Sequence, residues 1–135
     1  MSITKKIVLI VIVILLIIAI FNLYLYAVRI LPQDGGSYCI SDYSHLIEIG
    51  YKTDKKYPKL KNRWDACKLG QQIILEFFPE SNLTFFTTEY FRTVYYDAQS
   101  DTWFVYVGLS DSSVSGGDYG CILSSEGSLI SCWSW

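Results

Sequence analysis

The sequence DTWFVYVGLSDSSVSGG, residues 101–117, contains a strand that is apolar on both of its faces. Successive side chains of a strand point to opposite faces of the sheet. One face carries Trp103, Val105 and Val107, and the other carries Phe104 and Tyr106. A helix can cover one of these faces, and the second face then either packs against more of the chain or stays open for a partner. The polar, acidic loop after Gly108 would lie at the rim of that second face.

Further segments with strand character flank this one. Residues 89–97, EYFRTVYYD, are rich in aromatic and β-branched residues, and AQSD forms a turn before the strand at residues 102–108. After the loop, residues 118–124 and 128–133 form two short apolar runs around a turn at residues 125–127. The sequence therefore predicts a four-stranded antiparallel meander.

The clearest helical pattern precedes the strands, at residues 58–78. Pro58 suits the first turn of a helix, and Pro79 ends it because the residue before a proline avoids the helical conformation. The side chains that recur on one face at helical spacing are Leu60, Trp64, Cys67, Gln71, Ile74 or Leu75, and Phe78. Residues 41–50 suit a short helix closed by Gly50. The predicted fold class is therefore α+β, with one or two helices packed on the sheet.

The N-terminal part of the chain is suited to cross a membrane. After Lys5 and Lys6, residues 7–28 carry no charge, and a helix of that length spans about 33 Å, enough for the hydrocarbon core of a bilayer. A cleaved signal peptide is the alternative, but the apolar run is long and Ala27 is not preceded by a small-x-small cleavage pattern. We therefore predict an uncleaved transmembrane signal anchor over residues 7–28.

The charges around this span predict its orientation. Two lysines precede it and only Arg29 follows closely, which favours a cytoplasmic N-terminus and an exported C-terminal domain. The predicted organisation is a cytoplasmic stub, a transmembrane anchor, a linker with a short helix, and an α+β domain. Their bounds are residues 1–6, 7–28, 29–57 and 58–135.

All four cysteines follow the span, and they are Cys39, Cys67, Cys121 and Cys132. An even number of cysteines in an exported domain predicts two disulfides. If residues 126–127 form a two-residue turn, Cys121 faces Cys132 at a distance suited to a disulfide. By elimination, Cys39 would pair with Cys67. A longer turn would make Cys121 and Cys132 diagonal neighbours, and four buried free thiols are the alternative.

The residue content disfavours several classes of function. Basic residues gather within residues 52–68, and the rest of the domain is acidic with Arg92 as its single basic residue, so nucleic acid is a poor partner. No C-x-x-C spacing occurs and His45 is the only histidine, which argues against a metal site. A Ser-His-Asp set could be built only through His45, so we expect neither enzymatic activity nor a cofactor.

The second half of the chain follows a known order of residues. A helix with an alanine and an apolar stripe precedes a tyrosine strand, an Asp-Thr-Trp strand with alternating valines, a Gly-Gly loop, an apolar strand and a glycine turn. The residues that carry this order are Ala66, Leu69, Ile73, Ile74, Tyr90, Asp101, Thr102, Trp103, Val105, Gly108, Gly116, Gly117, Ile122, Gly127 and Leu129. From about Asp65 onward the chain resembles the small bacterial immunity proteins of the nuclear-transport-factor-2-like fold.

This resemblance implies a nuclear-transport-factor-2-like or cystatin-like sheet and a role in binding and neutralising a cognate protein toxin. Together with the anchor, it implies a single-pass protein of the bacterial inner membrane whose C-terminal domain lies in the periplasm or outside the cell. The toxin would then act in the periplasm, on the wall or on the membrane. A small-ligand-binding module and a structural envelope module are the alternatives.

The expected partner-binding residues lie on and beside the doubly apolar strand. Phe104 and Tyr106 would be aromatic anchors, because aromatic centres with polar rims give protein interfaces their affinity. The acidic rim would comprise Asp111 and Asp118 in the following loop, and Asp97 and Asp101 at the preceding turn. The alternative is that both faces of the strand are core, the second being covered by the short helix and the C-terminal tryptophans.

Overall fold

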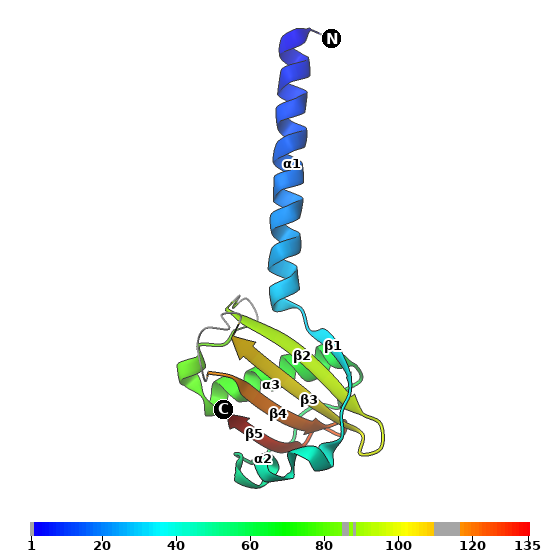
Figure 1. Ribbon diagram of the computed structural model, residues 1–135, viewed down its shortest axis with the longest axis vertical. Helices are drawn as coiled ribbons and strands as arrows, with labels where there is room; N and C mark the ends of the chain where they lie inside the picture. The colour runs from blue at the N-terminus through cyan, green and yellow to red at the C-terminus, as the bar shows by residue number, and fades with distance from the viewer. Residues whose placement is uncertain (1, 85–86, 88, 110–116) are drawn as a thin grey trace.

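The computed structural model describes residues 2–84, 87, 89–109 and 117–135, and it places a long N-terminal helix on a domain built around one sheet (Figure 1). The helical elements are α1 (Ile3–Ile30), η1 (Ile40–Tyr43), α2 (Ser44–Ile49), α3 (Arg63–Phe77) and η2 (Pro79–Ser81), where η denotes a short 3-10 helix. The strands are β1 (Gln33–Ser37), β2 (Tyr90–Asp97), β3 (Thr102–Leu109), β4 (Tyr119–Ser124) and β5 (Leu129–Ser134). The predicted α+β class is confirmed.

The sheet has one strand more than the sequence predicts. Its strands lie in the order β1-β2-β3-β4-β5; β2 to β5 form the expected antiparallel meander, whereas β1 pairs parallel with β2. The prediction of a four-stranded antiparallel sheet is therefore wrong, because the sheet is five-stranded and mixed. The sequence of β1, QDGGS, does not indicate a strand, since glycine is depleted from strands. Gly35 is suited to this place because a Cβ there would come within 2.5 Å of the Tyr95 ring, which covers the strand.

Residues 29–57, expected to form a linker with a short helix, contain the end of α1 and the elements β1, η1 and α2. Only Leu31 and Pro32 separate α1 from β1. The short helix is confirmed as α2, preceded by η1. Beyond α2, Tyr51 pairs with Cys132 along the outer edge of β5 through backbone hydrogen bonds of 2.7 and 3.0 Å. The chain therefore wraps the sheet from its first strand to its last edge before α3 begins.

Helix α3 covers one face of the sheet and begins later than predicted. Asn62 is its N-cap in place of an expected start at Pro58, and the Asn62 side chain accepts a hydrogen bond of 3.0 Å from the N–H of Asp65. The buried face also differs from the prediction, because Trp64 is 46% exposed. Gly70 allows the helix to approach β3 closely, since a Cβ there would lie 2.9 Å from the side chain of Val105.

Both faces of β3 pack against apolar side chains. On the α3 face, Val105 and Val107 belong to the main core, and Trp103 packs against it. On the other face, Phe104 belongs to a second, mostly aromatic core beneath η1 and α2. The members of this second core are Phe104, Ile122 and Trp133, with Tyr38, Ile40, Tyr43, Leu46, Ile47, Tyr95, Tyr106 and Ile130 packed against them. The predicted alternation of faces is confirmed, and the interpretation of both faces as core holds for Phe104.

A fully buried arginine joins the end of α1 to the domain. Arg92 lies on the α3 face of β2, and 0% of its surface is exposed. Its guanidinium donates hydrogen bonds to the side-chain oxygen of Gln71 and to the backbone carbonyls of Arg29, Thr84 and Tyr90, each of 2.9 Å. These oxygens come from α3, the end of α1, the segment after η2, and β2 itself. One side chain therefore holds four parts of the chain together.

Arg92 remains protonated, and therefore charged, despite its burial. Desolvation lowers the pKa of Arg92 from its usual value. That usual value is so high that the guanidinium remains protonated at neutral pH. Hydrogen bonds from a charged donor are about twice as strong as neutral ones, and the four bonds of Arg92 compensate part of the cost of removing its charge from water. Oxygens arranged around a buried cation lose these bonds together when the cation is removed.

We expect Arg92→Met to lower the free energy of unfolding by about 3 kcal/mol or more, because it leaves the Gln71 amide and buried carbonyls without their donor. Near-ultraviolet circular dichroism of the full chain in detergent, followed through a denaturant titration, measures this loss. Lys68→Met removes an exposed cation from α3 and should change stability by less than about 0.5 kcal/mol. Equal stability of the two variants would contradict the structural role of Arg92.

Candidate functional site

The first expected anchor of a partner is a core residue. Phe104 is only 3% exposed, and its ring stacks on that of Trp133 with the centroids 5.7 Å apart. Tyr43 of η1 covers it at a centroid distance of 4.8 Å. Phe104 is therefore not available as an exposed aromatic anchor. Asp111, expected in the rim, lies outside the described residues.

Tyr106 and Asp118 bind each other at the far end of β3. The hydroxyl of half-buried Tyr106 donates a hydrogen bond of 2.6 Å to one carboxylate oxygen of Asp118, and the N–H of Leu109 donates one of 3.1 Å to the other. Burial, and then the bond to Asp118 and its charge, raise the pKa of Tyr106 to about 12. Both oxygens of Asp118 are thus bonded to residues of β3 near its end.

Asp97 also has a structural role, at the turn between β2 and β3. Its carboxylate accepts hydrogen bonds from the hydroxyl of Ser100 at 2.9 Å and from the backbone N–H groups of Gln99 and Ile40 at 3.0 and 3.2 Å. The bond from Ser100 contributes most to lowering the pKa of Asp97. Because Ile40 begins η1, which packs over the second core, this carboxylate links η1 to the end of β2.

Asp101 supports two aromatic rings on the α3 face. One oxygen of its carboxylate accepts hydrogen bonds from the hydroxyls of Tyr96 at 2.6 Å and Ser125 at 2.7 Å. Ser125 in turn accepts a bond of 2.9 Å from the indole N–H of Trp103. These bonds lower the pKa of Asp101, that from Tyr96 foremost. The rings of Tyr96 and Trp103, whose centroids lie 4.5 Å apart, are therefore held at their polar ends by one shared network.

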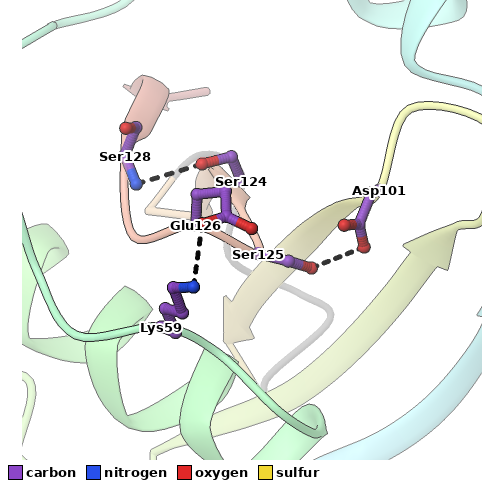
Figure 2. Close-up of polar contacts among 6 residues, drawn as sticks. All are labelled: Lys59, Asp101, Ser124, Ser125, Glu126 and Ser128. Atoms are coloured by element: carbon purple, nitrogen blue, oxygen red, sulfur yellow. Dashed lines mark hydrogen bonds and ion pairs between the residues drawn. The ribbon is translucent and has the colours of Figure 1, made fainter.

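The turn that carries Ser125 is itself well defined (Figure 2). The hydroxyl of Ser124 accepts a hydrogen bond of 3.1 Å from the N–H of Ser128, and Lys59 lies 3.5 Å from Glu126. Both partners of this ion pair are highly exposed, so it contributes little to stability. The side-chain and backbone bonds of the turn therefore fix Ser125, and through it the bond between Ser125 and Asp101 that Figure 2 shows.

Tyr96 and Trp103 form the floor of a groove between α3 and β1. The groove has a volume of about 450 Å³, and its lining comes from four elements and the N-cap region of α3. The residues that line it are Asp34, Lys61, Asn62, Arg63, Trp64, Val94, Tyr96 and Trp103. We call it the aromatic groove. Strands β2 and β3 supply its floor, the beginning of α3 supplies one side, and β1 supplies the other.

The helix side of the aromatic groove is basic. Lys61 and Arg63 flank the N-cap Asn62, at the end of α3 where the helix dipole also favours an anion. The Nε atom of Arg63 is buried without a hydrogen-bond partner, and the guanidinium lies 6.0 Å from the centre of the Trp64 ring. A buried donor without an acceptor costs free energy. A carboxylate that entered the groove would lie beside the positive charges of Lys61 and Arg63.

Two other clefts on the outer side of α3 lack these features. Their volumes are about 300 and 290 Å³, and no aromatic side chain lines either of them. Within the part of the chain that the structure describes, no three His, Cys, Asp or Glu side chains gather as a metal site would require. The aromatic groove is therefore the best candidate site. Its Trp, Tyr and Arg side chains are the types that dominate binding energy in protein interfaces.

Sequence reasoning missed this groove. Trp64 was expected on the buried face of the helix, and Asp34 was expected in a linker. Of the predicted site residues, Asp101 touches the groove, and it does so through its bond to Tyr96. One signal was present: Asn62 is a favoured N-cap residue and is followed by an acidic first turn. A helix start at Asn62 would have moved Trp64 to the exposed first turn.

The two cysteines of the β4–β5 hairpin face each other as predicted, although the turn between the strands differs from the expected one. Cys121 pairs with Cys132 across β4 and β5. The turn between the strands has three residues, 125–127, in place of the expected two, because the N–H of Ser124 bonds to the carbonyl of Ser128. A one-residue shift of register then leaves Ile130 unpaired and restores the facing position. The structure holds these two cysteines as free thiols, so their disulfide stays a prediction.

The structure does not bring the other two cysteines together. Cys39 is an exposed thiol between Tyr38 and Ile40, which pack on the second core. Cys67 is buried in the main core beneath α3, and burial raises the pKa of its thiol to about 11. The sheet therefore separates the two thiols that elimination would pair.

Comparison with known proteins adds no relative. No family model matches the chain, and neither the curated proteins nor the solved structures contain a significant match. The resemblance to bacterial immunity proteins therefore stays a prediction from the sequence, and a function has to be argued from the groove and from the apolar helix.

We expect Cys121 and Cys132 to form a disulfide in an oxidising compartment. The backbone N–H and carbonyl of Cys132 both bond to Tyr51, so the two cysteines are a non-hydrogen-bonded pair with Cα atoms about 4.5 Å apart, within disulfide range. Such a bridge would stabilise the domain by about 3 kcal/mol. Alkylation of the exported protein under denaturing, non-reducing conditions should label Cys39 and Cys67 alone, as mass spectrometry can show.

Protein that is reduced before the same alkylation is the control, and it should take up label at every cysteine. Labelling of Cys121 and Cys132 without prior reduction would contradict the predicted bridge.

Proposed function

We propose that this chain is a membrane-anchored immunity protein whose domain binds and neutralises a cognate toxin through the aromatic groove. The observation that supports this best is an aromatic floor whose polar ends are hydrogen-bonded to Asp101 and Ser125, next to the basic side chains of Lys61 and Arg63. Side chains that are already ordered in the free protein lose less conformational entropy on binding, which raises affinity. The lining contains no serine, cysteine or histidine, so binding fits the groove better than chemistry.

The apolar helix supports an anchored location. α1 is long and apolar enough to cross a membrane, and none of its apolar window is buried against the domain. Lys5 and Lys6 at its beginning favour the cytoplasmic side, which would export the domain. In the proposed setting the protein spans the bacterial inner membrane once, and the domain meets its toxin in the periplasm or outside the cell.

The distribution of charge indicates the chemistry of the partner. Arg92 is the only basic residue from position 69 onward, and it is fully buried, so the exposed charges of that part of the chain are all acidic. Exposed cations are concentrated between α2 and the first half of α3, where Lys61 and Arg63 reach the aromatic groove. We therefore expect the toxin to present an aromatic or apolar side chain beside a carboxylate.

A small ligand is the second candidate for the same site. The groove volume of about 450 Å³ falls within the range of small-molecule pockets. Such pockets enclose most of their ligand, whereas Trp64 is nearly half exposed at this groove. An open aromatic surface of this kind is better suited to a protein side chain.

A competition assay tests both the function and the site. A strain that lacks the gene is mixed with its parent on a surface and is complemented with the wild-type gene, with Arg63→Ala/Trp64→Ala, or with Ile49→Ala. Both changed residues of the double variant are interface hot-spot types, so binding should weaken about 30-fold or more and protection should be lost. Ile49 is 63% exposed on α2, and its replacement should leave protection intact.

The outcomes separate two claims. Survival of the unprotected strain beside its parent would remove the immunity function. Full protection by the double variant, at equal amounts of membrane protein, would leave immunity standing and remove the aromatic groove as its site. Rescue of the unprotected strain by loss of one neighbouring secreted-protein gene would identify the toxin.

A further inference from the structure

The junction between the apolar helix and the domain is short and fully structured. Ile30 and Pro32 are buried, and β1 begins at the next residue, Gln33. The side-chain amide of Gln33 donates a hydrogen bond of 3.4 Å back to the carbonyl of Val28 in the last turns of α1. No flexible spacer therefore stands between the described helix and the described sheet, and Figure 1 shows α1 leaving directly from the end of the sheet where β1 and β2 lie.

Arg92 ties the last turn of the helix to the domain. Its guanidinium bonds to the carbonyl of Arg29 in α1 and, with other donor groups, to Thr84 and Gln71 of the domain. All of these atoms are buried or partly buried, where hydrogen bonds are stronger than in water. A turn of the domain about the end of α1 would break the bond from Arg92 to the Arg29 carbonyl and leave the buried guanidinium without one of its acceptors.

The length of the helix places its end at the lipid headgroups. A bilayer core takes about 20 helical residues, so a span that begins at Ile7, after the lysines, leaves the hydrocarbon near Tyr26. Arg29 lies about 4.5 Å further along the helix axis, within the headgroup layer. Tyr24 and Tyr26 at the boundary are residues of the type that prefers this interface.

A side chain of the sheet lies at the same level. Phe91 of β2 is 38% exposed, and the guanidinium carbon of Arg29 lies 5.8 Å from the centre of its ring. Phe91 meets the guanidinium end of Arg29, so its depth in the membrane differs from that of Arg29 by no more than the length of this side chain. The exposed part of the Phe91 ring therefore faces headgroups, where an aromatic ring is favoured.

We propose that the end of the domain that carries Phe91 lies in the headgroup layer and binds phospholipid headgroups directly, so that the domain stands on the bilayer in one orientation. This inference rests on the proposed membrane anchoring and adds a second lipid contact, made by the sheet. Phospholipid is the occupant because the covalent connection through α1 keeps this surface at the bilayer permanently.

Photo-crosslinking in native membranes tests the lipid contact. The full chain is made with p-benzoylphenylalanine in place of Phe91, which keeps a ring beside Arg29. The matched control has the same group in place of Ile49, which is also exposed but belongs to α2, at the end of the domain opposite to α1 in Figure 1. After irradiation, phospholipid adducts measured by mass spectrometry should be several-fold more abundant at position 91 than at position 49.

The outcomes distinguish this inference from the anchoring itself. A chain that resists carbonate extraction but gives no more lipid adduct at position 91 than at position 49 would overturn the headgroup contact and leave the anchor standing. Adducts to a protein in place of lipid at position 91 would also overturn it. A chain released from membranes by carbonate would overturn both the inference and the anchored function.

Discussion

The buried guanidinium of Arg92 is the interaction on which the arrangement of this molecule depends. A cation without contact with water must have its hydrogen bonds satisfied, and here the acceptors come from α1, α3, β2 and the segment after η2. None of these segments can move alone without leaving a buried charge underbonded. We expect the charge to supply specificity, since an apolar side chain of similar size would not select one position of α1 on the sheet.

With α1, α3 and the sheet held in this way, the two faces of β3 acquire different surroundings. One face meets α3 closely at Gly70, and the other is closed by η1 and α2 over the ring of Phe104. Aromatic side chains contribute to both cores, which suits a small domain with little volume in which to bury apolar surface. The aromatic groove lies at the border of the main core, between the beginning of α3 and the edge strand β1.

The sequence predicted what depends on local pattern. The strands at residues 90–97 and 102–109, the alternation along β3 and the short helix all follow from periodicity and turn residues. It could not predict β1, whose glycines carry no strand signal, nor the groove, whose residues meet only after distant segments pair. The hairpin shows both limits: the facing cysteines were predicted, but a three-residue turn and an unpaired Ile130 together replaced the simpler turn.

The short connection between α1 and the domain and the hydrogen-bonded floor of the aromatic groove have the same consequence for binding. Tyr96 lies five residues beyond Phe91 on β2, about 17 Å along the strand, so in the proposed setting the groove stands at a fixed distance from the headgroups. A flexible linker would let the domain sit at many distances from the bilayer, and a partner would then have to select one of them on binding. The bonds of Arg92 to α1, and those of Asp101 and Ser125 to the groove floor, reduce the conformational entropy that a partner would have to remove on binding. A partner that acts close to the membrane would therefore meet a site already placed and shaped for it.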